Sequence, residues 1–308
     1  MRRLVTRRAL LLVPTVLGVA LLVFACLHLV PGDPVEIMLG ETAAPADVAA
    51  LRRDLGLDRP LLAQLGRFLG GVARGDLGES LTYRVPVARV VAARYSATLE
   101  LAATAFLVAV GFGVPLGVLA AVRRGSGSDR FVRVVSLAGA CLPTLWLGPL
   151  LVLVFSIQLG WLPVSGRGGL AHLVLPACTL ALGMVGVLVR LTRATMLGVM
   201  GDDYVRTAHA KGATPARVAL RHALPNALPP VVTVAGLQAG ALLAGAIITE
   251  TVFAWPGVGR LLVQAIAARD YPLVQGCVLV VGCSYVAVNA LTDLVCGALD
   301  PRVRDGDA

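Results

Sequence analysis

Residues 99–122 read LELAATAFLVAVGFGVPLGVLAAV, a run of 24 residues whose only charge, Glu100, stands next to its start. A helix needs about 20 apolar residues to cross the roughly 30 Å hydrocarbon core of a bilayer. Because lipid offers no partners to backbone N–H and C=O groups, an apolar run of this length crosses it as a helix. We therefore predict a transmembrane helix over Leu99–Val122.

Five further stretches share this apolar, nearly uncharged character: Ala9–Val30, Val134–Leu159, His172–Val189, Leu228–Phe253 and Leu273–Leu299. The whole chain is 57% hydrophobic and 15% charged, with a mean hydropathy of +0.82, whereas an ordinary soluble domain is about 25% charged. A soluble globular protein and a disordered chain are both excluded. We predict an all-α polytopic membrane protein, with about six transmembrane helices in a single domain over residues 1–308.

Basic residues are divided unevenly between the loops that join these spans. One set of loops, with both chain ends, carries 16 of the 27 basic residues against seven acids, whereas the other set has 11 of each. Positive loops stay in the cytoplasm, so we expect both termini there. The net charge of +9 thereby reports topology, and no nucleic-acid partner is needed to explain it.

The longest loop on the other side covers residues 31–95 and carries helix signals of its own. Pro60 precedes an apolar stripe at helical spacing and suits a first helical turn. A second short helix is expected over Asp47–Leu55, closed by Gly56. The stripe is expected to pack on the spans or to lie at the membrane interface, and a docking surface for an external partner is the functional alternative.

The loop over residues 190–226 is shorter and richer in charge. Asp202 or Asp203 can cap a helix over Tyr204–Lys211, and Gly212 suits the left-handed position that ends it. Thr214 then offers a second cap, with Pro215 at the first helical position. We expect this second helix to run to Leu224, before Pro225.

Two short helices held at a fixed angle by a glycine suit the transmission of force from a partner. An interfacial hairpin is the alternative, and the residues alone leave the two open. The loop does, however, resemble the EAA loop of permease subunits of ATP-driven (ABC) importers, in particular the dipeptide/oligopeptide/nickel class. Six further blocks resemble that class in order along the chain: LVPGDP (29–34), LRRDLGLDRP (51–60), RGDLGES (74–80), GWLPVSG (160–166), TETVFAWPGVGR (249–260) and RDYP (269–272).

The resemblance implies the architecture of a type I ABC importer permease, and specifically the first, B-type, of two related subunits. It implies that the loop docks on an ATPase subunit through Asp203, Tyr204, Arg206, Ala208, Lys211, Gly212, Thr214, Pro215 and Arg217. His209, where the family more often has Arg, and Pro225 depart from the usual pattern.

The resemblance also implies partners and a location. The partners are a second homologous permease, in a heterodimer, then ATPase subunits that bind ATP and Mg, an extracytoplasmic solute-binding protein and the lipid bilayer. The location is the bacterial cytoplasmic membrane. Members of the class carry di- and oligopeptides, nickel chelates, glutathione or sugars, and we expect peptides here.

No catalytic residue, cofactor or metal site is expected in the chain itself. Its one lysine, Lys211, is followed by Gly212 and Ala213, so a phosphate-binding P-loop is absent and the chain is not an ATPase. An ion-coupled secondary carrier is the alternative transporter, but such carriers bury ionisable groups near the middle of the membrane. Here Glu100, Glu250 and Asp293 lie near predicted span ends.

The histidines and cysteines follow no metal-binding or nucleophile pattern. Three residues are candidates for lining the solute path. Gln238 lies within the small-residue stretch Gly236–Gly245, and Glu250 and Trp255 lie near the outer end of the fifth span.

Overall fold

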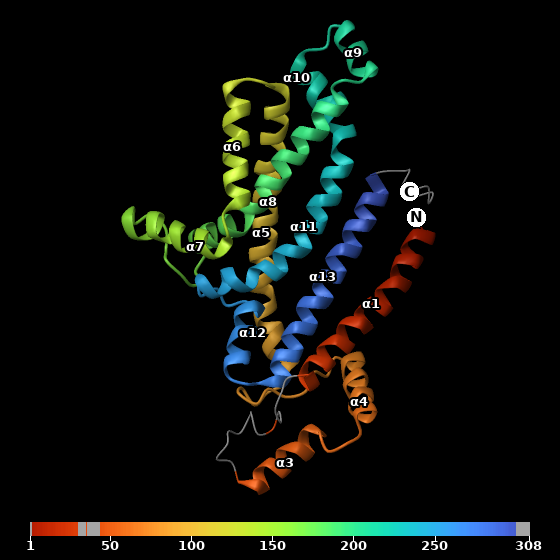
Figure 1. Cartoon of the computed structure of the whole chain (residues 1–308), viewed down its shortest axis with the longest axis vertical. Coiled ribbons are helices and arrows are strands. Elements are labelled where there is room, and N and C mark those ends of the chain that lie inside the picture. The colour runs from red at the N-terminus through yellow and green to blue at the C-terminus, as the bar shows by residue number, and fades with distance from the viewer. Residues whose placement is uncertain (1, 30–34, 36–43, 300–308) are drawn as a thin grey trace.

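The computed structural model describes residues 2–29, 35 and 44–299, and this part of the chain is helical apart from loops and one isolated bridge between Glu79 and Pro86. Six long helices form the bundle in Figure 1: α1 (Arg2–Leu29), α5 (Val87–Val122), α6 (Gly127–Cys141), α8 (Leu170–Val199), α11 (Leu224–Val252) and α13 (Tyr271–Leu299). Shorter helices join them: α3 (Pro45–Leu55), α4 (Leu61–Arg74), α7 (Thr144–Leu151), α9 (Asp203–Ala210), α10 (Pro215–Arg217) and α12 (Val258–Ala267). Two π-helical segments, η1 (Val152–Gln158) and η2 (Val218–Ala223), complete the series. The prediction of an all-α fold is confirmed.

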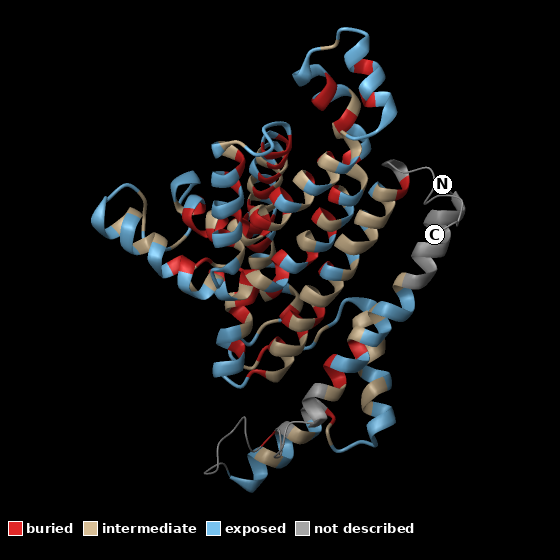
Figure 2. Ribbon diagram, turned by 45° about the horizontal axis from the view of Figure 1, so that its top comes forward, coloured by how far each residue is buried: buried red, intermediate tan, exposed pale blue. Residues whose placement is uncertain are grey.

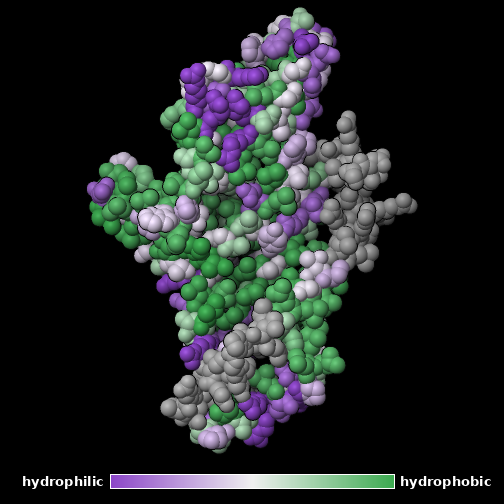
Figure 3. Space-filling view, in the orientation of Figure 1, coloured by the Kyte–Doolittle hydropathy of each residue, from purple (hydrophilic) through white to green (hydrophobic). Residues whose placement is uncertain are grey.

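Four helices are long and apolar enough to cross a membrane by themselves: α5, α8, the continuous run Pro215–Val252 and α13. α8 continues past Arg190, so the fourth span is longer than the sequence indicated. In α1 the described side chains include the apolar stretch Leu12–Ala25. The chain is thus a multi-pass membrane protein, with a hydrophobic band between two hydrophilic ends (Figure 3). Residues 30–34 of the LVPGDP block lie outside the described residues.

The predicted third span, Val134–Leu159, is not one helix. α6 ends at Cys141, α7 begins at Thr144, and the two halves are bent by 107°. Leu142 between them has extended dihedrals of −76° and 120°. The residue before a proline is driven out of the α region by the proline ring, so Pro143 accounts for the break.

The buried core lies where α5, α8 and α11 meet, and Figure 2 shows most of the buried residues along these central helices. Glycines let α5 and α8 approach closely. A Cβ built on Gly113 would lie 2.8 Å from Cβ of Leu188, and one on Gly117 would lie 2.6 Å from Cβ of Thr192. Small residues at such crossings are how membrane helices gain packing contacts, so this pair forms a tight unit.

The two predicted loops lie at opposite ends of the bundle (Figure 1). At one end, α3 closes at Gly56 in the left-handed conformation (φ 68°), as expected. α4 follows Pro60, which precedes the helix as its cap instead of lying in its first turn. At the other end, α9 and α10 project beyond the long helices.

Candidate functional site

The first arm of the projecting loop is α9. Asp202 occupies its cap position with extended dihedrals, but its side chain makes no capping hydrogen bond, and the helix starts at Asp203, one residue earlier than predicted. Gly212 follows with φ of +82°. The N–H of Ala213 donates to the carbonyl of Ala208 at 3.2 Å, the closing bond of a glycine-terminated helix. The predicted turn at Gly212 is confirmed.

The second arm begins as predicted and ends differently. Thr214 Oγ1 accepts from the N–H of Arg217 at 3.4 Å, with Pro215 at the first helical position. The helix does not stop before Pro225, because α10, η2 and α11 form one run, Pro215–Val252. Pro225 lies inside this run, directly after the π-helical segment η2, where i→i+5 bonds replace the i→i+4 bonds that a proline would break. The second arm is therefore the end of a spanning helix.

A small core of their own holds the two arms together. Val205 and Ala208 of α9 pack against Val218, and all three are buried, with Ala213 of the turn beside them. Ala208, which the resemblance assigns to the docking surface, is 9% exposed. Its small side chain therefore serves the packing between the arms.

A polar contact joins the arms at their base. The Tyr204 hydroxyl donates to the carbonyl of His222 at 3.4 Å and accepts from Asn226 Nδ2 at 2.8 Å. Asn226 Nδ2 also donates to the His222 carbonyl at 3.1 Å. Sequence reasoning singled out Tyr204 but missed Asn226, whose position one turn after His222 was the available signal.

The outward face of the loop is polar and mainly basic. Eight of the nine predicted docking residues are exposed: Asp203, Tyr204, Arg206, Lys211, Gly212, Thr214, Pro215 and Arg217. Arg206 faces Asp203 at 3.6 Å, but both side chains are largely in solvent, so this pair contributes little to stability. The surface offered to a partner thus carries the cations Arg206, Lys211 and Arg217.

The candidate path residues are fully or partly buried in this conformation. Glu250 and Trp255 are both 0% exposed, so this conformation gives them no surface in a solute path. Gln238 on α11 is half-buried. The path role of these residues stays a prediction, but in this conformation the polar atoms of Glu250 and Trp255 bond to neighbouring elements.

Glu250 and Trp255 instead join α5 to the turn before α12. Glu250 Oε1 accepts from Thr98 Oγ1 at 2.7 Å, and Glu250 Oε2 accepts from the N–H of Arg260 at 2.9 Å. Thr98 Oγ1 also accepts from the N–H of Val258 at 2.8 Å. Trp255 Nε1 donates to the carbonyl of Ala97 at 2.8 Å. Both residues are thus structural in this conformation.

A second buried carboxylate ties the segment before α5 to the start of α13. Asp270 Oδ2 accepts from Ser80 Oγ at 2.5 Å and from the N–H of Thr82 at 2.9 Å, and Oδ1 accepts from the N–H of Leu273 at 3.2 Å. Burial by itself raises the pKa of Asp270, but these hydrogen bonds outweigh it, so the pKa lies below its ordinary value. The carboxylate is therefore ionised in the folded protein.

The described residues bring no three His, Cys, Asp or Glu side chains together as a metal-ligand set. What the geometry defines is a spanning helical bundle with a rigid two-armed loop at one end. Its fold resembles that of the inward-facing MetNI methionine ABC transporter, with a TM-score of 0.56 and 21% identity over 68% of this chain and 96% of that chain. The fold class is thus the type I ABC importer permease.

Sequence comparison identifies the family. Residues 113–305 match the binding-protein-dependent transport system inner membrane component, and residues 1–102 match the N-terminal component of such systems. The chain belongs to this family and is a permease subunit of an ABC importer. Among the alternatives from sequence, the ion-coupled carrier is thereby set aside.

Three bacterial proteins are similar to this chain over nearly its whole length. The di/tripeptide transport system permease protein DppB of Pseudomonas aeruginosa (strain UCBPP-PA14) is 46% identical over 97% of this chain and 98% of its own. The dipeptide transport system permease protein DppB of Escherichia coli (strain K12) is 44% identical over 99% of both. The glutathione transport system permease protein GsiC of Salmonella paratyphi A (strain ATCC 9150 / SARB42) is 43% identical over 97% and 98%.

Proposed function

We propose that this chain is the B-type permease subunit of a peptide importer, and that it forms the translocation path with a second, homologous permease. The names of its relatives support the solute class, because dipeptides, tripeptides and glutathione are all short peptides. Nickel chelates and sugars, which other members of the class carry, have no such support here.

We propose further that the loop between α8 and α11 docks on an ATPase subunit that binds ATP and Mg. The observation that carries this proposal is the construction of the loop. Gly212 (φ +82°), the core around Val205 and the Tyr204 contact fix its shape, while Arg206, Lys211 and Arg217 face outward. A rigid element with an exposed cationic face suits a partner groove that moves when ATP binds.

The loop end of the bundle is assigned to the cytoplasm, together with both termini, because it carries the excess of basic residues. The segment over residues 31–95 then faces outward and meets the solute-binding protein. ATP-driven closure of the ATPase pair would displace the loop, and the helices α8 and α11 that carry it would change the access to the path. The chain itself holds no cofactor in this scheme.

Reconstitution of the complete importer in lipid vesicles tests the solute. The permease pair, the ATPase subunits and the solute-binding protein are combined, and ATP hydrolysis and uptake are measured with radiolabelled dialanine, glutathione and a nickel chelate. We expect dialanine or glutathione to stimulate hydrolysis and to accumulate, with no accumulation when the binding protein is omitted. Stimulation by the nickel chelate alone would refute the peptide assignment.

Site-specific photo-crosslinking tests the docking surface. A photoreactive amino acid at Arg217, on the loop, is compared with one at Leu61, which is 58% exposed at the opposite end. We expect the Arg217 probe to label an ATPase subunit and the Leu61 probe to label none. Labelling from Leu61 but not from Arg217 would contradict both the docking role and the orientation.

A further inference from the structure

One buried ion pair joins Asp129 near the start of α6 to Arg193, which the sequence placed in the loop but which lies in α8, because α8 runs to Val199. Arg193 Nε donates to Asp129 Oδ1 at 2.8 Å, and Arg193 Nη2 donates to Oδ2 at 3.0 Å. The Asp129 side chain is 1% exposed and that of Arg193 is 20% exposed. Such a two-pronged, largely desolvated contact fixes both distance and direction between the two helices.

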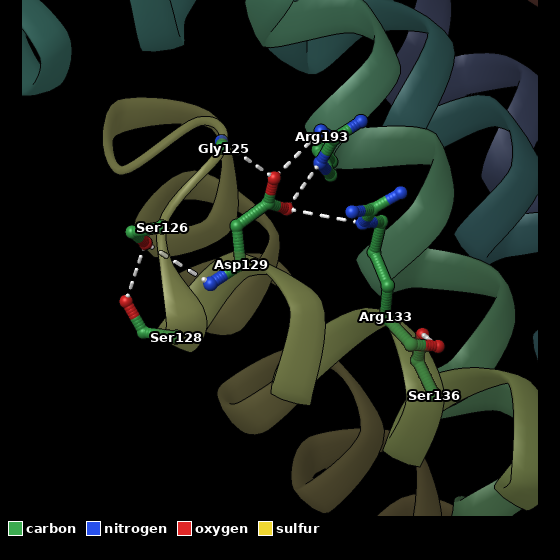
Figure 4. A network of polar contacts seen from close by, with 7 residues as sticks. All are labelled: Gly125, Ser126, Ser128, Asp129, Arg133, Ser136 and Arg193. Atoms are coloured by element: carbon green, nitrogen blue, oxygen red, sulfur yellow. Dashed lines mark hydrogen bonds and ion pairs between the residues drawn. The ribbon is translucent and has the colours of Figure 1, made fainter.

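The turn between α5 and α6 is built to present this carboxylate (Figure 4). Ser126 Oγ accepts from the N–H of Asp129 at 3.3 Å and caps α6, while the N–H of Gly125 donates to Asp129 Oδ2 at 2.9 Å. Gly125 has φ of +80°, a conformation that glycine adopts readily. Arg133, one turn on, approaches Oδ1 at 3.4 Å, but its own side chain is 50% exposed. Asp129 therefore receives donors from its own turn and from α8.

Arg193 lies close to the point where α8 leads into the docking loop, so the pair holds α8 next to that loop. Arg193 lies six residues, or about 9 Å of helix axis, before α8 ends at Val199 and the docking loop begins. Close contacts hold the same stretch of α8 from two sides. Thr192 packs against Gly117 of α5, and Gly186 lies against the backbone of Ser136 on α6. The ion pair adds a third contact among α5, α6 and α8, nearest to the docking loop.

Two helical segments, which we call stems, connect the docking loop to the bundle: the end of α8 (residues 193–199) and η2. The η2 stem contacts the bundle differently from the α8 stem. Ala219 and Ala223 of η2 pack with Val118 of α5 and Met196 of α8 through small apolar contacts. η2 is itself a π-helical segment, a form that often marks functional sites in helices. The α8 stem is thus joined to the bundle by a charged, directional contact, whereas the η2 stem is joined by apolar packing.

We propose that Asp129 and Arg193 are positioning residues for energy coupling: their ion pair fixes the α8 stem to the α5–α6 turn, so that displacement of the docking loop is transmitted to the spans. The inference rests on the proposed docking of this loop on an ATPase. Without the pair, the loop still docks and ATP is still hydrolysed. Part of the displacement of the loop then moves the end of α8 relative to the α5–α6 turn and does not reach the spans.

The role of the pair is tested in the complete importer, reconstituted with its partners. The measured quantity is the number of ATP molecules hydrolysed for each radiolabelled dialanine molecule transported. Arg193→Lys keeps the charge and removes the two-pronged geometry, and Asp129→Asn removes the charge at nearly constant shape. Arg133→Gln is the matched control, since it removes the exposed neighbour of the same carboxylate. We expect this ratio to rise on the order of fivefold in the first two variants and to stay unchanged in the control.

A second measurement separates positioning from folding. Spin labels at Arg124, in the α5–α6 turn, and Lys211, in the loop, report the distance between them in the assembled complex. We expect a broader distance distribution in Arg193→Lys than in the parent or in Arg133→Gln. Unchanged coupling and distances, or loss of assembly in both pair variants but not in the control, would overturn the positioning role. If the parent complex showed no ATPase response to loaded binding protein, the proposed function itself would fail.

Discussion

Tyr204 of α9 and Asn226 at the start of α11 meet through a 2.8 Å hydrogen bond that joins the two arms of the docking loop. The residues are 22 positions apart, and the bond crosses from the first arm to the foot of the second. The angle between the arms therefore depends on one hydroxyl as well as on the turn at Gly212.

Replacing Tyr204 by Phe removes that hydroxyl and keeps the ring. We expect a local loss of about 0.5–1.5 kcal/mol, the usual net contribution of one hydrogen bond, and faster amide hydrogen exchange in α9. Thr207→Val is the control, because the Thr207 hydroxyl donates to the carbonyl of Asp203 within α9 and not, among the described residues, across to the second arm. Equal exchange in both variants would show that the Tyr204 contact does not hold the arms.

Replacing Gly212 by Val forces a β-branched residue into a left-handed backbone position. We expect strain of about 1–3 kcal/mol, with reduced transport and reduced co-purification of the ATPase while the permease still inserts. Gly198→Ala is the control, since Gly198 lies within α8 and a Cβ there meets nothing within 4 Å. Normal transport and normal ATPase binding by the Gly212→Val variant would rule out a coupling role for the turn.

Replacing Glu250 by Leu leaves the donors from Thr98 and Arg260 buried without their acceptor. We expect a destabilisation of about 1–3 kcal/mol, seen as a lower thermal unfolding midpoint of the purified complex. Glu100→Gln is the control. Glu100 pairs with Arg167, the two side chains are 41% and 40% exposed, respectively, and exposed ion pairs contribute about 0–1 kcal/mol to stability. A midpoint that falls equally in both would contradict the structural role of Glu250.

The Asp270 contacts predict a pH dependence of the segment before α5. Because the folded pKa lies below the ordinary value of 3.8, the contribution to stability is complete above that value and is lost as the pH falls through the folded pKa. We expect an acid-active protease to cleave residues 76–86 faster as the pH falls through that range.

Ser80→Ala removes one of the donors that lower the pKa of Asp270. At neutral pH the ionised carboxylate should therefore stabilise the folded segment less in this variant than in the parent. We expect its cleavage to be faster at neutral pH and to change less on acidification. Ser165→Ala, at an exposed serine in another loop, should behave as the parent does. Identical pH profiles for the parent and Ser80→Ala would show that Asp270 does not anchor this segment.

Local sequence signals predicted the turns of this protein well. Gly56 and Gly212 both end helices in the left-handed conformation, and Thr214 caps the second arm. Each of these features depends on neighbours within a few residues, so composition and spacing carry the information. The docking roles of the loop residues remain predictions.

Prolines were harder to interpret. Pro143 breaks a predicted span, whereas Pro225 lies inside the continuous run Pro215–Val252 and Pro115 lies inside α5. The difference comes from what surrounds each ring, including the π-helical register before Pro225, which sequence patterns do not show. Distant pairs were equally hidden: Asp129 and Arg193 are 64 residues apart, and Ser80 and Asp270 are 190 apart.

The contacts of the loop after the broken helix bear on how the polypeptide is threaded through the membrane. The N–H of Gly166 donates to the carbonyl of Phe253 at 2.8 Å, and Arg167 stacks over Trp255. Both partners lie in the short segment between α11 and α12, and α12 lies far from the turn between α5 and α6 (Figure 1). The chain between Gly125 and Gly166 therefore runs from one end of the bundle toward the other although no straight helix joins them. A bent pair that crosses the membrane in this way leaves every later helix on the same side as one straight span would.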